Sequence, residues 1–512
     1  MRLGQVISYY GVVLCFVTVV GSAWAQSDAP GISSWAVEVH RLALSVHDTG
    51  PESDSTGVFP PLIPQVLPSF DPTGIVETYN LGAPTVTAAN PFFQSLGTNG
   101  RACATCHEPR SAWGVSTDSI QERFYESDGT DPIFRPVDGA TCPSDDISTL
   151  AAKRTAYNLL LSKGLIRIFL PLPATQLGTN PPVPRDYEIT AVSDPYGCTD
   201  LSSNPPVISV YRRPLPSANL RFLTECPPNQ TACAPLSIMW DGREPSLQSQ
   251  SIDATLNHAQ ALSPPTGPQI TQIVNFESGI FDAQEFDFDA GSLHTYQAGG
   301  GPAALSQQNF FIGINDVLSP GFTPVIFTLY TPWENLPPFG FNEARASVAR
   351  GEILFNSKPI TISGVNGLNL FPTDPLGANT IVGTCGTCHD SPNVGNHSKK
   401  LPINIGVADA APPVLDVSGL PVFTVKCTET TGPLAGQTFT VTDLGKALIS
   451  GSCADVGKVK GPILRGLAAR APYFHNGSAH SFEDVVNFYD QRFGIGFTDQ
   501  EKEDLIAFLQ TL

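Results

Sequence analysis

The spacing of apolar residues predicts two helices in the C-terminal part of the chain. Residues 498–512 begin with a capping box formed by Thr498 and Glu501. Their apolar positions fall on one helical face: Leu505, Phe508, Leu509 and Leu512. Residues 342–355 also have helical spacing, with mostly small side chains on one face: Ala346, Ala349, Gly351 and Phe355. We therefore expect the closing helix to cross the earlier one closely.

Other segments have the pattern of β-strands. Within an insertion at about residues 131–235, apolar runs separated by Pro- and Gly-rich turns predict three strands, at 165–170, 187–192 and 207–211. Residues 422–427 and 438–441, on either side of TETTGPLAGQ, predict a hairpin. The Pro- and Gly-rich stretch at 331–340 is the expected domain linker.

The N-terminus has the features of a secretory signal peptide. Arg2 precedes an apolar run at 12–20, and the small-residue pattern Ala23-Trp24-Ala25 predicts cleavage after Ala25. No other stretch comes near the roughly 18 uninterrupted apolar residues that a membrane span requires. We therefore expect a periplasmic or secreted protein without a membrane span.

Composition narrows the class of partner. The net charge is −19, and 47 Pro and 45 Gly interrupt a chain that is still 41% hydrophobic. These values predict a loop-rich globular protein of one to three domains. An acidic surface argues against nucleic acid and anionic membranes, and favours a basic electron-transfer partner.

The eleven cysteines divide by position. One lies in the signal segment, four belong to two Cys-x-x-Cys-His motifs, and six remain. An even number in an oxidising compartment predicts disulfides, and proximity in the chain favours Cys142–Cys198, Cys226–Cys233 and Cys427–Cys453. The alternative is that these six are buried thiols.

The two Cys-x-x-Cys-His motifs predict covalently attached haem. Their members are Cys103, Cys106 and His107 in the first, and Cys385, Cys388 and His389 in the second. Two copies arise by chance in about one of 10⁵ sequences of this composition. Cysteines one helical turn apart reach the two vinyl groups of one porphyrin, and the adjacent histidine lies beneath the iron. Zinc and thiol redox chemistry fit less well, because each motif carries its own histidine and the two lie far apart.

These observations predict a mainly α fold with two cytochrome c-like haem domains and β-rich, loop-rich insertions. After the signal peptide at 1–25, the N-terminal haem domain is expected at 26–335 and the C-terminal haem domain at 336–512. Two haem c groups are the expected cofactors.

Two further strings, MWDGREPSLQSQ at 239–250 and a longer one at 460–493 that begins KGPILRGLAARAPYFHNG, complete an ordered set of four motifs. Together they resemble the bacterial dihaem cytochrome c peroxidase and MauG family from about Asn90 to Leu512, apart from the insertions. The resemblance implies that hydrogen peroxide or dioxygen reacts at the N-terminal haem. It also implies that the C-terminal haem relays or stores electrons, which a small donor protein, a cytochrome or a cupredoxin, would supply.

The resemblance assigns Trp240 to the space between the haems, as an electron relay, whereas a large aromatic residue there could equally serve packing. Asp241 and Arg243 either form a structural ion pair or bind haem propionates. Family members are often dimers and commonly bind calcium. A homodimer and a calcium ion therefore stay open here, although the usual asparagine ligand of calcium is replaced within YRRPLPSANL.

The chain departs from the family on the distal side of the first haem. Dihaem peroxidases usually carry a distal glutamate downstream of Trp-Asp-Gly-Arg, but this chain reads SIDATLNHAQAL, with His258 and Gln260 near that place. Histidine serves as an acid or base and glutamine as a hydrogen-bond partner, so both are candidate catalytic residues. The alternative for His258 is a structural histidine. No histidine occurs between His107 and His258, so the first haem is either open to a small oxidant, which we favour, or ligated from the His258 segment.

The second haem lacks the methionine ligand that is common in the family, because the only methionines are Met1 and Met239. Alignment of SFEDVVNFYDQRF with the ligand position of the MauG branch places Tyr489 there, as a hard anionic ligand. The rival ligands are His397, His475 and His480, and the alternative role for Tyr489 is in the core.

Three functions are compatible with this pattern. The leading one is an exported peroxide-reducing oxidoreductase with electrons relayed between two haems. The second is oxidation of a protein or organic substrate, as in MauG or the related haem rubber oxygenases. The third is a non-catalytic electron-transfer cytochrome.

Overall fold

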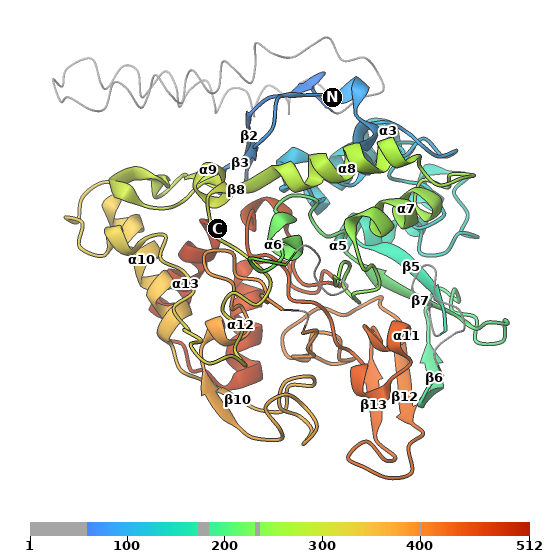
Figure 1. The fold of residues 1–512 in the computed structure, drawn as a ribbon. Helices are drawn as coiled ribbons and strands as arrows, with labels where there is room; N and C mark the ends of the chain where they lie inside the picture. The colour runs from blue at the N-terminus through green and yellow to red at the C-terminus, as the bar shows by residue number, and fades with distance from the viewer. Residues whose placement is uncertain (1–58, 173–183, 231–235, 400) are drawn as a thin grey trace. The chain divides into compact units, whose positions relative to one another are not determined.

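The computed structural model of the protein describes residues 59–512, apart from 173–183, 231–235 and 400 (Figure 1). The predicted signal peptide and the Cys226–Cys233 pair therefore lie outside the described residues, the latter because of Cys233. Residues Pro61–Leu512 form one compact unit. The boundary between two haem domains stays a prediction.

The largest sheet has four antiparallel strands in the order β2-β3-β8-β9. Their bounds are Val66–Asp71, Gly74–Asn80, Ile280–Asp287 and Gly291–Ser292. The hairpin between β2 and β3 turns at Asp71, whose side chain accepts hydrogen bonds from the backbone of Thr73 and Gly74. Pairing of β3 with β8 joins segments about 200 residues apart in sequence.

The strands expected in the two insertions are confirmed, and they join in a way that the sequence did not indicate. β5 pairs with β7, whereas β6 pairs with β12 of the C-terminal half, so that β13, β12 and β6 form one sheet (Figure 1). The bounds are Ile166–Pro171, Tyr187–Ser193 and Val207–Arg212 for β5 to β7, and Val422–Cys427 and Thr438–Val441 for β12 and β13. Two short pairs complete the described strands: β1 Leu62–Ile63 with β4 Thr85–Val86, and β10 Ile360–Ile362 with β11 Ile381–Gly383.

The described α-helices occur on both sides of the second haem motif in the sequence. The described α-helices before the second haem motif are α3 Thr117–Ser127, α4 Leu150–Ala156, α5 Asn158–Lys163, α6 Arg221–Thr224, α7 Leu247–Asn257, α8 Gly267–Gly279, α9 Pro302–Ser306 and α10 Asn342–Ser357. Those after it are α11 Ala447–Ser450, α12 Phe482–Phe493 and α13 Asp499–Gln510. With five sheets among the described residues, the expected mainly α fold is met only in part, because the insertions and the N-terminal segment contribute many strands.

The predicted crossing of the two C-terminal helices is confirmed. α10 and α13 pack directly on each other (Figure 1), and a Cβ added to Gly351 would lie 2.0 Å from the carbonyl oxygen of Asp504. The Arg350 side chain pairs with the Asp504 carboxylate at 2.6 Å. Thr498 caps α13 by accepting a hydrogen bond from the backbone of Glu501. Glycine at position 351 thus allows the two backbones to approach.

Two of the predicted disulfides are confirmed. Cys142–Cys198 and Cys427–Cys453 are both bonded, each with a Cα–Cα distance of 5.6 Å. The first closes a loop of the insertion, and the second lies beside the β12–β13 hairpin. The stretch at 331–340, expected as a linker, contains the fully buried Trp333, whose indole donates to the carbonyl of Thr295 at 2.9 Å. Among the described helices, none is both long and apolar enough to cross a bilayer.

Candidate functional site

The two Cys-x-x-Cys-His motifs have the same local structure. Each begins with a 3-10 turn, Cys103–Thr105 in the first and Cys385–Thr387 in the second. The backbone N–H of the second cysteine donates to the carbonyl of the first at 3.1 Å in both turns. The threonine before the second cysteine accepts a hydrogen bond from the backbone N–H three residues earlier in the chain, Ala102 for Thr105 and Thr384 for Thr387, which closes the turn in both motifs. All four thiols of the two motifs are free of disulfides.

The histidines of the two motifs are also held in the same way. The Nδ1 atom of His107 lies 3.0 Å from the carbonyl oxygen of Trp113, and Nδ1 of His389 lies 2.7 Å from that of Gly395. In each case the acceptor is six residues further on. A carbonyl accepts only from N–H, so Nε2 keeps its lone pair. Burial lowers the pKa of both rings to about 4, which keeps them neutral. Both histidines are therefore prepared to bind a metal through Nε2.

Each motif lines a cavity of its own. The first cavity is lined by Cys103, Cys106 and His107, and the second by Cys385, Cys388 and His389. The empty space within them, part of it open to solvent, is about 1380 and about 1710 Å³. Apolar side chains form most of both walls. Two paired thiols, a neutral histidine and a large apolar chamber form a donor set that fits a covalently bound porphyrin in each cavity.

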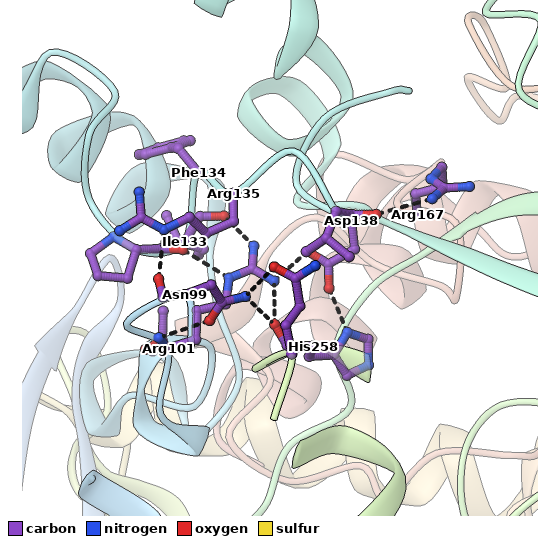
Figure 2. Close-up of polar contacts among 12 residues, drawn as sticks. Asn99, Arg101, Ile133, Phe134, Arg135, Asp138, Arg167 and His258 are labelled. Atoms are coloured by element: carbon purple, nitrogen blue, oxygen red, sulfur yellow. Dashed lines mark hydrogen bonds and ion pairs between the residues drawn. The ribbon is translucent and has the colours of Figure 1, made fainter. Parts of the chain in front are cut away.

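His258 lies in the first cavity, held by a buried carboxylate (Figure 2). It follows the last turn of α7, and its Nδ1 is 2.5 Å from Oδ2 of Asp138. The other oxygen of Asp138 pairs with the buried Arg101, whose guanidinium also donates to the carbonyls of Pro132 and Ile133. The histidine thus has one ring nitrogen fixed by Asp138, and its Nε2 makes no hydrogen bond within the described part of the chain.

The charge of Asp138 is stabilised by its partners. Burial alone would raise the pKa of this carboxyl, but the Arg101 guanidinium and the hydrogen bond to His258 outweigh it and hold the pKa below its usual value. Sequence reasoning missed Asp138 and Arg101. No local signal marked them, since Asp138 lies 120 residues from His258.

Gln260 and Arg243 lie outside both cavities. Gln260 is exposed, with its side-chain oxygen 3.3 Å from Nδ2 of Asn99. The guanidinium of Arg243 pairs with Asp241 at 3.2 Å and approaches Asp253 at 3.7 Å. Of the two roles considered for Arg243, the described contacts are those of the structural ion pair.

A tight turn directs two neighbouring residues into different cavities. The backbone N–H of Gly242 donates to the carbonyl of Met239 at 3.2 Å, and Met239 lines the first cavity whereas Trp240 lines the second. Gly242 has φ +72°, and a Cβ there would lie 2.2 Å from Oγ of Ser237. This close approach explains the glycine of the Trp-Asp-Gly-Arg motif.

Buried contacts on both sides fix Trp240. Its indole N–H donates to the carbonyl of Arg213 at 2.8 Å, and its ring lies 6.0 Å from that of His475 in an edge-to-face arrangement. The next residue, Asp241, pairs with Arg212, which also binds the carboxylate of Asp443 at 2.7 and 2.9 Å. This buried ion network anchors the turn between the cavities.

Tyr489 and two of its rivals line the second cavity. One face of α12 points into that cavity, with Phe482, Val485, Val486, Tyr489 and Phe493. Burial raises the pKa of Tyr489 well above its usual value in the absence of a metal, and the thiols of Cys388 and Cys385 add to the effect. His397 and His475 also line the cavity, and Nε2 of each is buried without a hydrogen-bond partner among the described residues. The exposed His480 lies outside it, with Nε2 3.2 Å from Asp416. The cavity thus offers one phenol and two imidazoles.

Parts of this chain are similar to known proteins. The cytochrome-c peroxidase IdrP2 of Denitromonas iodatirespirans is 35% identical over 137 residues, which cover 25% of this chain and 36% of that protein. A quarter of this chain is therefore similar to a cytochrome-c peroxidase. The cytochrome-c peroxidase IdrP1 of Pseudomonas sp. (strain SCT) is 40% identical over 81 residues, 14% of this chain and 21% of that protein. The resemblance expected from the four motifs is thereby confirmed.

The likeness to these peroxidases is partial in extent. The chain spans 36% or less of the length of the curated relatives it matches. No protein-family model matches. A solved structure described as a MauG-like protein associated with microbial copper homeostasis covers 83% of this chain and 86% of its own, at 15% identity. The TM-score between the two structures is 0.35. Within the described residues, no group of three or more His, Cys, Asp or Glu side chains is arranged to hold a metal ion, and the calcium expectation stays open.

Proposed function

We propose that this protein is an exported dihaem c-type cytochrome that reduces hydrogen peroxide in the first cavity with electrons that enter through the second. The observation that carries the proposal is the arrangement of the first cavity. It combines a haem-binding motif, whose His107 is oriented by a carbonyl, with His258, which is oriented by a buried carboxylate. An iron ligand and an acid/base group in one apolar chamber are the elements that peroxide reduction requires.

The cofactor would be held by residues that the structure brings together in each cavity. Cys103 and Cys106 would form the thioether bonds in the first cavity, and His107 would bind the iron. Cys385, Cys388 and His389 would do the same in the second. Haem bound in this way supplies the redox-active iron at which peroxide binds and through which electrons pass.

His258 would move the protons. With Asp138 accepting from Nδ1–H, the free Nε2 can take a proton from peroxide and return it to the oxygen that leaves as water. Asp138 keeps the ring in that tautomer and stabilises the imidazolium between the two transfers. Reduction to two waters consumes two electrons and two protons, and the protons reach the cavity from solvent through this half-exposed histidine.

Electrons would cross from the second cavity to the first along the turn that holds Trp240. The support for this route is that Met239 and Trp240 are adjacent in the chain and line opposite cavities. The donor would be a small cytochrome or cupredoxin, since the chain is acidic and would attract a basic partner.

The test is the reaction of the purified two-haem protein with hydrogen peroxide, followed by stopped-flow spectroscopy and by oxidation of a reduced small cytochrome. His258→Gln should lower the second-order rate with peroxide about 10²-fold, the low end of the contribution of an acid/base group. His294→Gln is the matched control, because His294 also pairs with a carboxylate, Glu285, but lies outside both cavities.

Each alternative function has its own outcome in this experiment. A two-haem protein that does not react with peroxide would be an electron-transfer cytochrome, and the proposal would fail. A protein that reacts with peroxide or dioxygen but oxidises an added organic or protein substrate in preference to the cytochrome would have the MauG-like or rubber-oxygenase-like activity.

A further inference from the structure

Four positively charged side chains line the cavities without a carboxylate partner. Arg213, Lys460 and Arg465 are buried, and Arg470 is partly buried. None has an Asp or Glu oxygen within 4.0 Å among the described residues, unlike Arg101, Arg212 and Arg243 nearby. Arg101, Arg212 and Arg243 therefore have counter-ions in the protein, whereas these four cavity-lining cations have none among the described residues.

The polar atoms of these four residues are incompletely satisfied. Arg213 and Arg465 donate only to backbone carbonyls, those of Lys163, Val115 and Arg470 for the former and that of Asn393 for the latter. Among the described residues, Nη1 of Arg465, Nε of Arg470 and Nζ of Lys460 have no hydrogen-bond partner. Donors are therefore left over on the cavity walls.

The four cations differ in which cavity they line. Lys460 and Arg470 line both cavities, Arg465 lines only the first, and Arg213 lines only the second. The backbone of Lys460 also donates to the carbonyl of Trp240 at 2.8 Å. Lys460 and Arg470 thus belong to the partition between the cavities, next to the turn that holds Trp240.

Such a cluster requires anions. A cation removed from water without a partner costs several kcal/mol, so four of them together would strongly destabilise the fold unless a ligand supplies negative charge. Haem carries two propionate carboxylates, and two haems carry four. Guanidinium and ammonium groups bind carboxylates well in a cavity of low dielectric.

We propose that Lys460 and Arg470 form a shared anion-binding wall that holds a propionate from each haem and thereby couples the reduction potentials of the two haems. The proposal rests on the two-haem part of the proposed function and is independent of its peroxide chemistry. A positive charge near a haem favours the reduced state, which carries one more electron. Loss of one charge from the shared wall should therefore lower both potentials.

The test is a spectropotentiometric titration of the holoprotein, with the haem content of each variant measured first. Lys460→Gln and Arg470→Gln should each shift both midpoint potentials to more negative values. Lys460→Arg and Arg470→Lys keep the charge and should leave both potentials close to those of the parent. Arg465→Gln should shift only the first haem, and Arg213→Gln only the second.

The outcomes separate this inference from the peroxidase proposal. A Lys460→Gln protein that holds two haems but shows a shift in only one potential, or in neither, would overturn the shared wall, and Arg470→Gln decides the matter if Lys460→Gln does not fold. A parent chain that binds a single haem would overturn the dihaem proposal and the inference together. Potentials that shift as expected in a protein inert to peroxide would support the wall and overturn only the peroxidase function.

Discussion

Replacing Asp138 by asparagine removes the carboxylate charge that pairs with both Arg101 and His258. Loss of one partner from a buried ion pair costs about 3 to 5 kcal/mol. We expect about 3 kcal/mol here, since Arg101 keeps its hydrogen bonds to the carbonyls of Pro132 and Ile133, at 2.8 and 2.7 Å. The variant should therefore fold with a lower free energy of unfolding.

The effect on peroxide chemistry should be larger than the effect on stability suggests. An asparagine side chain can present its NH₂ group as well as its oxygen to Nδ1 of His258, so the tautomer with a free Nε2 is no longer enforced. We expect the second-order rate with peroxide to fall about 10²-fold, as for removal of an acid/base group.

Stopped-flow kinetics over a range of pH, with denaturant unfolding of the same samples, measures both effects. The Asp138 pKa is depressed in the folded state, so its stabilisation is present at neutral pH and is lost as the pH falls through that pKa. Parent and variant should therefore converge in stability in acid. Glu285→Gln is the control, since it removes the carboxylate beside His294, outside the cavities. A folded Asp138→Asn protein with the parental rate of reaction with peroxide would show that Asp138 does not position His258.

Four further predictions follow from the cavities and the core. Trp240→Phe should cost about 1 kcal/mol through its lost indole hydrogen bond and slow electron transfer between the haems, measured by flash photolysis; a parental rate in a folded protein would exclude the relay. Tyr489→Phe should change the ferric spectrum of the second haem and leave the first intact, and an unchanged spectrum would transfer the ligand role to a cavity histidine. Changing Cys427 and Cys453 to serine opens a loop of 26 residues and should lower the free energy of unfolding by about 3.5 kcal/mol in denaturant titrations. Burial raises the pKa of Glu277 from 4.5 to about 8, so the folded parent retains this proton and its free energy of unfolding falls as the pH rises between those values. In denaturant titrations, the free energy of unfolding of Glu277→Gln should be close to that of the parent at pH ~5 and higher by up to about 5 kcal/mol at pH ~9.

Features defined by neighbouring residues were predictable from the sequence. The capping box at Thr498 depends on a residue three positions later, and the hairpin around residues 428–437 depends on alternation within ten residues of a turn. The haem motifs are equally local, and each one lies in a cavity. The Cys142–Cys198 pair was also anticipated, although it spans 56 residues, because only a few cysteines were available to pair.

Features that join distant segments were not predictable. Asp138 reaches His258 across 120 residues, and β6 pairs with β12 across more than 200. Neither contact produces a periodic pattern in the sequence. A single aspartate can pair with many cations, and a half-exposed strand can pair with many other strands, so the sequence does not identify the partner. The absence of a carboxylate beside Lys460 likewise follows only from the positions that the fold gives to the described Asp and Glu side chains.

The turn at residues 238–244 limits how this protein can change in evolution. Surface loops usually tolerate insertions and deletions. Here a single inserted or deleted residue would change which cavity Met239 and Trp240 line. It would also place another residue at the position of Gly242, where Ser237 leaves no room for a side chain. A substitution at Met239 or Trp240 alters the lining of one cavity, whereas a change in the length of the turn alters the lining of both. We therefore expect related chains to vary in length elsewhere, and to keep the number of residues between Ile238 and Glu244, whose backbones bond to each other.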